Sequence, residues 1–366
     1  MKTIANPIML IAAVFAVFAS GTAGAKEPPS HFALVQAVLD QHVLPRFEAL
    51  DTSAAALPPD VKSLCKNGGD GAREELIGHF RQTVSDWAGV EYLRFGPLAD
   101  GGRRERFSFW PDPRGVMTRQ LRQLIVSKDL KAIEAGAITK QSAALQGLPA
   151  LEVLLQDKDV PLGPGDPAAY RCALAKAIAE NLSGLAHELH EAWVAPAGWK
   201  AKMLRPGSDN DTYKEPSEAA GEFLKALLTG LQILGDVEVK PRIDANKDEP
   251  ASGPFAKSGP FSKSGLSDVY FESGAASLKA LYDAMNLEAF LAEDKDWVKP
   301  WAMGAWRAIL SSNGMGGVAS SANVKKEDAP PLKELHGRIG GLRQLIGKEM
   351  ASAAGLTLGF NELDGD

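Results

Sequence analysis

This chain has few of the residue types that build common catalytic and metal sites. Its 366 residues include two cysteines and six histidines, and aromatic residues make up 7% of the total. Neither cysteine has a Cys or His neighbour at metal-ligand spacing, which argues against a metal pair. The stretch HELHE, from His187 to Glu191, lacks the final His of a zinc-peptidase helix. His187, His190 and Glu191 can share one helix face, so we weigh a solvated face against a weak metal site.

An excess of basic charge is also lacking. The chain carries 40 Lys and Arg against 46 Asp and Glu, a formal net charge of −6. This balance argues against nucleic acid as the main partner, because phosphate binding needs concentrated positive charge. Arg114, Arg119 and Arg122 stand at helical spacing, which predicts one solvated helix face.

No apolar run is long enough to span a membrane. The longest of the amino-terminal part, residues 8–19, falls short of the roughly 20 residues that a spanning helix needs. Lys2 precedes it and the small residues 23–25 follow it, as in a cleavable export signal. We expect residues 1–25 to be removed and the mature protein, which is not membrane-spanning, to reside in the periplasm.

The two cysteines take on a different meaning in an exported chain. Thiols in an oxidising compartment persist as disulfides, so we expect Cys65 to pair with Cys172. In the chain-entropy model, closing a loop of roughly 100 residues contributes up to about 4–5 kcal/mol.

The apolar pattern is helical nearly throughout, and no period-2 run exceeds a few residues; Val237-Glu238-Val239 is the best of them. A Pro- and Gly-rich joint at residues 196–214 separates two groups of helices. We expect an all-α fold of two packed helical bundles, residues 26–198 and 199–366, with a loop at 238–265. A helical solenoid is the alternative, but no repeat of suitable length supports it. The expected helices cover residues 31–50, 72–95, 117–126, 141–155, 167–193, 216–234, 266–291, 297–311 and 332–350.

One acidic residue lies within an apolar helix pattern. In QGLPALEVLL, residues 146–155, Leu148, Leu151 and Leu155 form a helical stripe around Glu152. An unpaired carboxylate is costly in such a setting. Glu152 therefore either lies on the wet face of the helix or points at a partner such as an Arg, a metal or a ligand.

The stretch FWPDPRG, residues 109–115, predicts a rigid turn. Pro111 and Pro113 bracket Asp112 and favour extended backbone at Trp110 and Asp112. The turn can present an aromatic face and a carboxylate to a pocket. Asp112 can also serve as an N-cap, with Pro113 opening the helix that follows. The two roles are compatible.

Three further features leave alternatives open. Arg94 can pair with Glu152 or Asp112, clamp an anionic ligand, or form a surface ion pair with Glu91. The tandem hexads GPFAKS-GPFSKS, from residue 253, predict either a lid or partner-docking loop or a plain connection tethered by its two phenylalanines. The carboxyl end offers Asn361 and Asp364 as oxygen ligands, although chain ends commonly fray.

Several of these segments together resemble the imelysin-like family. Gly147 and Glu152 match its Gly-x-His-x-x-Glu motif, with Pro149 at the His position. LRFGPL at residues 93–98 and FWPDPRG at 109–115 are similar to its Arg-Phe-Gly-Pro and Trp-Pro-Asp block. GFNELDGD at residues 359–366 is similar to its ending. The resemblance spans nearly the whole mature chain in the right order, and it also implies two helical bundles.

The resemblance implies an exported bacterial protein, nominally placed with the M75 metallopeptidases and tied to iron acquisition. It implies a ligand site in an inter-bundle cleft, with Glu152 as a ligand for iron or zinc. Pro149 cannot coordinate a metal, and we expect its missing N–H to loosen the helix before Glu152. We therefore favour binding of a ligand or iron species over a metal-dependent peptidase or an envelope protein that docks an iron-transport partner. The expected site comprises Gly147, Glu152, Arg94, Trp110, Asp112, Asn361 and Asp364.

Overall fold

The computed structural model describes residues 28–245, 259–312 and 331–357. Within these ranges the chain is helical and contains no strand, which confirms the predicted all-α class. The expected export signal, the hexad at residues 253–258 and the tail with Asn361 and Asp364 lie outside the described residues. No helix in the described ranges combines the length and apolar character needed to cross a bilayer.

A long helical run crosses both bundles. Helix α1 (His31–Val38), the π-helical turn η1 (Leu39–Val43) and α2 (Leu44–Asn67) follow one another without a break. Ser30 caps the start, since its hydroxyl accepts a hydrogen bond from the Ala33 N–H at 3.2 Å. The predicted end at residue 50 is wrong, because α2 continues through Pro58 and Pro59. Packing against α3 (Asp70–Ala88) and α7 (Asp166–Val194) stabilises α2 along its length.

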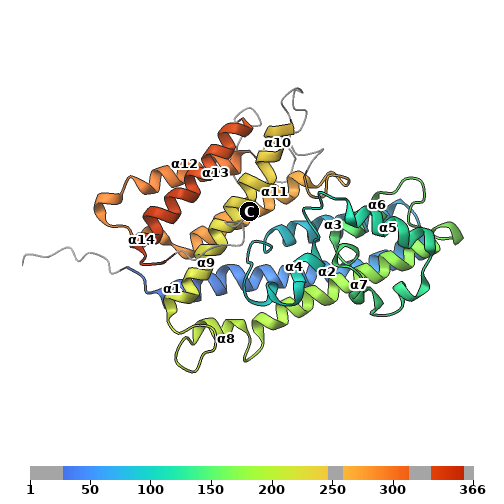
Figure 1. Ribbon diagram of the computed structural model, residues 1–366, viewed down its shortest axis with the longest axis horizontal. Coiled ribbons are helices and arrows are strands. Elements are labelled where there is room, and N and C mark those ends of the chain that lie inside the picture. Colours follow the sequence, from blue (N-terminus) through green and yellow to red (C-terminus); the bar gives the residue numbers. More distant parts are fainter. Residues whose placement is uncertain (1–27, 246–258, 313–330, 358–366) are drawn as a thin grey trace, which may run out of the picture.

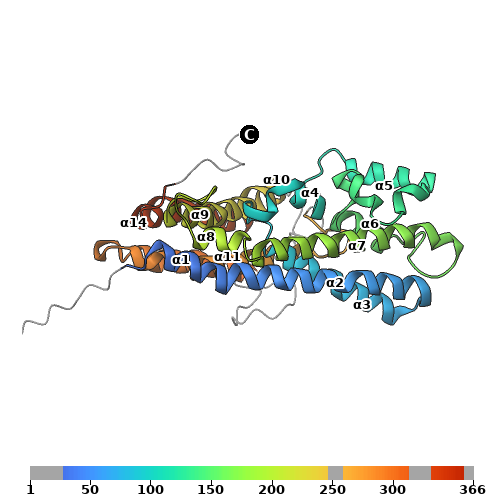
Figure 2. The same ribbon diagram turned by 90° about the horizontal axis from the view of Figure 1, so that it is seen from below.

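The first bundle is built on α2, α3 and α7, which Figure 2 shows running lengthwise through the molecule. Helices α5 (Val116–Ser127) and α6 (Leu148–Gln156) cover one side of α7. A disulfide between Cys65 on α2 and Cys172 on α7, with Cα atoms 5.8 Å apart, joins two of its helices. This pairing confirms the predicted disulfide.

The second bundle contains α9 (Pro216–Gln232), α11 (Ser267–Met285), α12 (Val298–Ser311) and α13 (Leu332–Leu345). Helix α1 packs against α9 and α11, so the first helix of the chain lies among the later ones (Figure 1). Helix α11 also packs against α3. The apolar interior is therefore continuous across both bundles, with Trp87, Trp193 and Trp306 almost fully buried in it.

Further predicted boundaries differ from the structure. The helix expected over 141–155 starts only at Leu148, and the one expected over 266–291 ends at Met285, where Asn286 takes a left-handed conformation. Residues 237–239 belong to the π-helical turn η7 (Ile233–Val239), and α10 (Lys240–Ala245) extends it, so the expected loop from residue 238 is helical up to 245. The helix predicted over 72–95 ends at Ala88, because the following residues turn into the RFGP segment. The remaining elements are η2 (Gly96–Leu98), η3 (Asp100–Gly102), α4 (Arg103–Phe107), η4 (Leu130–Ile133), η5 (Ala137–Lys140), η6 (Ala143–Leu145), α8 (Trp199–Leu204), η8 (Leu287–Phe290), η9 (Glu293–Lys295), η11 (Ile346–Met350) and α14 (Ala351–Ala353).

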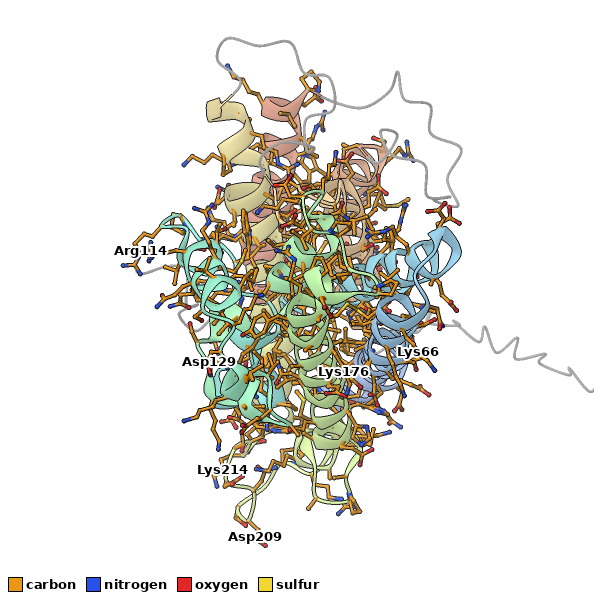
Figure 3. All side chains as sticks on the ribbon, turned by 90° about the vertical axis from the view of Figure 1, so that its right-hand side faces the viewer. Lys66, Arg114, Asp129, Lys176, Asp209 and Lys214 are labelled. Atoms are coloured by element: carbon orange, nitrogen blue, oxygen red, sulfur yellow. A yellow bond between two sulfur atoms is a disulfide. The ribbon has the colours of Figure 1, made fainter. Side chains whose placement is uncertain are left out.

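Many charged side chains point outward on the face shown in Figure 3. Lys66, Arg114 and Lys176 project away from the helices in Figure 3. Arg119 and Arg122 are exposed like Arg114, so the basic stretch forms the solvated face that its spacing predicts.

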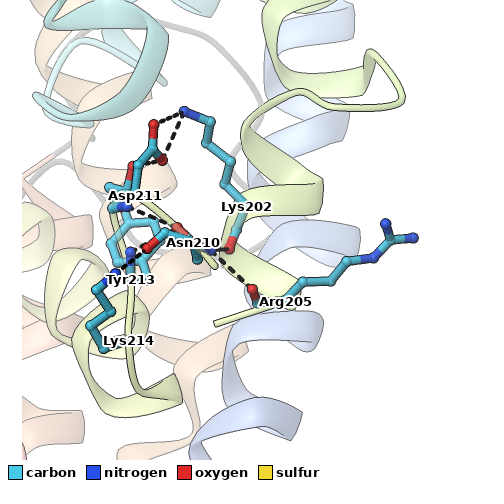
Figure 4. A network of polar contacts seen from close by, with 7 residues as sticks. Lys202, Arg205, Asn210, Asp211, Tyr213 and Lys214 are labelled. Atoms are coloured by element: carbon cyan, nitrogen blue, oxygen red, sulfur yellow. Dashed lines mark hydrogen bonds and ion pairs between the residues drawn. The ribbon is translucent and has the colours of Figure 1, made fainter. Parts of the chain in front are cut away.

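One asparagine organises the joint between the bundles. The Asn210 side-chain amide donates to the carbonyl oxygens of Lys202, at 2.7 Å, and Arg205, at 3.0 Å (Figure 4). Its side-chain oxygen accepts from the backbone N–H groups of Thr212, at 2.8 Å, and Tyr213, at 2.9 Å. The joint is thus held in one conformation by local hydrogen bonds, and it places the buried Tyr213 beneath it.

We predict that Asn210→Ala lowers the free energy of unfolding by about 1–3 kcal/mol, because two carbonyls and two N–H groups lose their partner. Urea unfolding followed by circular dichroism measures the change. The matched control is Asp209→Ala, at an exposed neighbour whose carboxylate accepts a hydrogen bond from the adjacent Ser208 hydroxyl. Equal stability of the two variants would contradict this role.

Candidate functional site at the seam between the bundles

The glycine before α6 allows two backbone segments to meet. A Cβ atom at Gly147 would lie 2.3 Å from the Phe107 carbonyl oxygen and 2.8 Å from that of Arg106. Backbone atoms cannot move aside cheaply, so only glycine fits here. This contact fixes where α6 starts and therefore where Glu152, one turn later, is placed.

Pro149 does not loosen α6, contrary to our expectation. It occupies the first turn, where backbone N–H groups have no acceptor within the helix. The turn itself is intact, because the N–H groups of Ala150 and Leu151 both donate to the Gly147 carbonyl at 3.2 Å. The proline therefore removes the imidazole of the motif without disturbing the helix that carries Glu152.

Glu152 points into the protein and is held by the second bundle. Its side chain belongs to a residue only 5% exposed, and Oε1 accepts from the Ser264 backbone N–H at 2.8 Å. The Ser264 hydroxyl lies 2.7 Å from the same oxygen. Burial raises the pKa of Glu152, while the two Ser264 contacts and the charge of Lys263 oppose that rise. The partner of the carboxylate is thus a serine of the second GPFSKS hexad.

The turn that carries Ser264 is itself anchored. Phe261 is buried, with a backbone φ of +58°, and its ring packs against Phe80 and Tyr270 at centroid distances of 6.3 and 5.4 Å. Where the turn begins, a Cβ atom on Gly259 would come within 2.3 Å of Arg242 Nη2. The turn therefore links Glu152 on α6 to residues of α10 and α11.

Beyond this turn lies a cluster of buried titratable groups. Glu91, Tyr92, Glu238 and Tyr270 line a cavity of about 10 Å³ between the two bundles. Burial and the charge of Glu91 raise the pKa of Glu238 to about 8. Burial also raises the pKa of Glu91, although the Tyr270 hydroxyl donates to its carboxylate and Arg94 lies near. Two acids that resist ionisation at one small cavity are typical of a functional site.

Arg242 supplies a counter-charge to this cluster. The residue is 2% exposed, and burial lowers its pKa to about 10 while Glu238 and Asp268 act in the opposite direction. A second small cavity adjoins the first through Tyr92, and Arg94 and Lys225 line it. Charged groups of both signs, from both bundles, therefore lie at this boundary. We call the boundary around Glu91, Arg94, Glu238 and Arg242 the seam.

A buried, neutral histidine begins a chain of hydrogen bonds through Tyr92 to Ser277. His42, in the π-helical turn η1, lies with Nε2 2.6 Å from the Tyr92 hydroxyl, which in turn lies 2.9 Å from the Ser277 hydroxyl. Ser277 donates to the Gly89 carbonyl at 2.8 Å. Burial, with a smaller contribution from the Arg46 charge, lowers the pKa of His42 to about 3.

The expected site residues fall into separate places. Gly147 and Glu152 lie at the start and in the middle of α6. Arg94 lies elsewhere, where its positive charge opposes the rise in pKa that burial causes at Glu91 and Tyr270. Asp112 caps α5, since its carboxylate accepts from the N–H groups of Val116, at 2.8 Å, and Met117, at 2.9 Å. The helix starts at Val116, so Pro113 does not open it as expected.

Sequence reasoning did not single out Ser264, Glu238, Arg242 or Tyr270. Glu238 gave a usable signal, because a lone acid between two valines has the same character as Glu152 among its leucines. The HELHE stretch faces a carboxylate, with the Nδ1 atoms of His187 and His190 lying 3.1 and 3.4 Å from Asp51 Oδ2. In the ranges that the structure describes, no three His, Cys, Asp or Glu residues are grouped to hold a metal ion.

The architecture defines an all-α protein of two bundles with buried acids between them. The chain belongs to the imelysin family, whose model matches residues 43–299. An imelysin-like protein from Psychrobacter arcticum 273-4 has a similar structure, with a TM-score of 0.69 and 18% identity over 90% of this chain and 97% of that one. A protein from Parabacteroides distasonis ATCC 8503, provisionally named an iron-regulated protein A precursor, also has a similar structure. Its TM-score is 0.62, with 15% sequence identity over 90% of this chain and 97% of that one. No curated protein matches the chain.

We predict that Ser264→Ala destabilises the protein in a pH-dependent way. The Ser264 hydroxyl favours the ionised form of Glu152, so its contribution is present above the pKa of Glu152 and fades as pH falls through it. A hydrogen bond to a charged group contributes about 1.5–3 kcal/mol. Urea unfolding at neutral and at acid pH measures the difference, with Ser262→Ala in the same turn as control. A loss that is equal at both pH values would count against the assignment.

We also predict that His42 limits acid stability. Its folded pKa lies near 3 and its unfolded value near 6.5, so the unfolded chain binds the extra proton between these values and stability falls as pH is lowered through that window. One proton corresponds to about 1.4 kcal/mol per pH unit. His42→Gln keeps a hydrogen-bonding side chain and removes the titration, so its stability should decline less steeply. Parallel curves for the two proteins, measured by chemical unfolding from pH 7 to pH 4, would refute this.

Proposed function

We propose that this protein is exported to the periplasm, binds an iron ion at the seam between its bundles and serves iron acquisition. Membership of the imelysin family supports the general role, as does the similar fold of a protein named as iron-regulated. The amino-terminal charge, apolar run and small residues support export. The observation that carries the proposal is a pair of acids at one cavity, the half-buried Glu91 and the buried Glu238.

The donors at this cavity suit iron as cargo. Glu91 and Glu238 offer carboxylates from different parts of the fold, and Tyr270 adds a phenol oxygen. Carboxylates that face each other from separate helices hold iron in the cores of other helical bundles. The cavity, at about 10 Å³, has room for an object the size of a water molecule, so it fits a bare ion and excludes a bulky chelate.

The raised pKa values give the proposed binding a direction with pH. Glu238, with its pKa near 8, must lose its proton before it can ligate a cation. Iron binding should therefore strengthen as pH rises toward 8. Arg242 and Arg94 place positive charge beside the same acids, which would weaken the hold and favour release of the cargo.

In this proposal Glu152 positions the site and does not ligate iron. Its carboxylate holds Ser264, the same turn packs Phe261 against Tyr270, and Tyr270 donates to Glu91. A metal-dependent peptidase and an envelope protein that docks an iron-transport partner are the other functions that the sequence leaves open.

We expect the mature protein to bind Fe²⁺ under anaerobic conditions, and Glu238→Gln and Glu91→Gln to weaken that binding at least about tenfold, or about 1.4 kcal/mol. Isothermal titration calorimetry at pH 7.5 measures the affinity, and the exposed Glu188→Gln is the control. Ferric citrate in equilibrium dialysis tests the oxidised ion.

Retention of both iron forms by the two seam variants at wild-type affinity would place the site elsewhere. Failure of the wild-type protein to bind either form would reject iron as the cargo. Cleavage of unfolded casein that chelator abolishes and zinc restores would favour the peptidase instead.

A further inference from the structure

A larger hollow, apart from the two small seam cavities, lies within the second bundle, between α9 with η7 and α13 with η11. Its free volume is about 330 Å³, which falls within the range of small-molecule pockets, roughly 300–1,000 Å³. This hollow is distinct from the seam cavities, since Glu91, Glu238 and Tyr270 do not line it. We call it the α9–α13 groove.

Apolar and cationic side chains share the lining of the α9–α13 groove. Leu228, Leu231 and Ile339 give it a buried apolar floor. Three cationic side chains, against one carboxylate, give its rim a positive balance. That carboxylate, Asp236, is engaged by His336, whose Nε2 lies 3.1 Å from Oδ1. The cationic residues are Lys225, Arg343 and Lys348.

Three glycines lie along the helical walls of the groove. Gly235, Gly340 and Gly347 all line it, and a Cβ atom on Gly340 would meet nothing within 4 Å. A glycine in a helix lowers the stability of that helix by about 0.8–1.0 kcal/mol relative to alanine. The wall without side chains therefore makes these helices less stable. Gly235 and Gly347 also lie in π-helical turns, η7 and η11, and such turns are frequent at functional sites.

We propose that the α9–α13 groove binds a small organic anion with an apolar chain, of the class of a medium-length alkyl carboxylate. The apolar floor accepts the chain, and the cationic rim accepts the anionic head by charge-assisted hydrogen bonds. The inference does not rest on iron binding at the seam. Lys225 also lines the small cavity beside Arg94, so a ligand in the groove would lie next to the seam.

Decanoate is a suitable probe for this groove, titrated calorimetrically into the mature protein at concentrations below about 1 mM. We expect saturable binding of decanoate, and binding at least about tenfold weaker for decanol and for acetate, which lack the charge and the chain respectively. Decyltrimethylammonium, which carries the opposite charge, should not bind.

Two pairs of variants locate the ligand. Gly340→Phe should fill the groove and weaken decanoate at least about tenfold, whereas Gly78→Phe, at an exposed glycine of α3 with equally open surroundings, should leave it unchanged. Lys348→Gln should weaken binding by roughly threefold to tenfold, and Lys333→Gln, exposed on α13 outside the lining, should not.

Circular dichroism of Gly340→Phe shows whether the variant remains folded, and Lys348→Gln provides an independent test that leaves the groove open. Equal affinity of decanoate for the wild-type protein and Gly340→Phe would overturn the proposal. Equal affinity for decanol and decanoate, or absence of decanoate binding to the wild-type protein, would do the same.

Discussion

The cost of burying carboxylates between the two bundles is the constraint on which the seam depends. A buried acid without partners is strongly destabilising, so each must find hydrogen bonds or a counter-charge. Glu152 on the first bundle finds Ser264, and Glu91 finds the hydroxyl of Tyr270 on α11. Because these partners come from the other half of the chain, neither side of the seam is satisfied until both bundles have packed. The continuous apolar core and the long run of α1, η1 and α2 enforce the same mutual dependence.

Much of the fold could be predicted from the sequence, because helical periodicity is a local signal. The stripe of leucines around Glu152 indicated a helix with a misplaced acid, and the paired cysteines indicated the disulfide. The helix expected to end at residue 50 continues as α2 to Asn67, because packing against α3 and α7 stabilises it. The valines around Glu238 resembled a strand although they lie in a π-helical turn.

The partners at the seam could not be predicted in the same way. Ser264 lies 112 residues from Glu152, and nothing in the local pattern of either segment specifies the other. A single sequence shows that a buried acid needs a partner but does not show which distant polar group supplies it. Gly147 illustrates the same limit. The position must be glycine because the backbone of Phe107, forty residues earlier, leaves no room for a side chain. Asn361 and Asp364 lie outside the described residues, and their expected part in the site stays a prediction.

The seam also explains how the chain tolerates a proline at the position of the family's histidine. Pro149 occupies a first-turn position that needs no N–H, and the hold on Glu152 comes from Ser264, so helix and carboxylate survive without the imidazole. Burial raises the pKa values of Glu91 and Glu238, because their charged forms are unfavourable in the free protein. A cation bound between them would offset that cost, and by linkage would stabilise the packing of the two bundles. On the proposed function, the affinity for the cargo is therefore the attraction of the cation for these carboxylates less the free energy needed to deprotonate them, and it rises with pH.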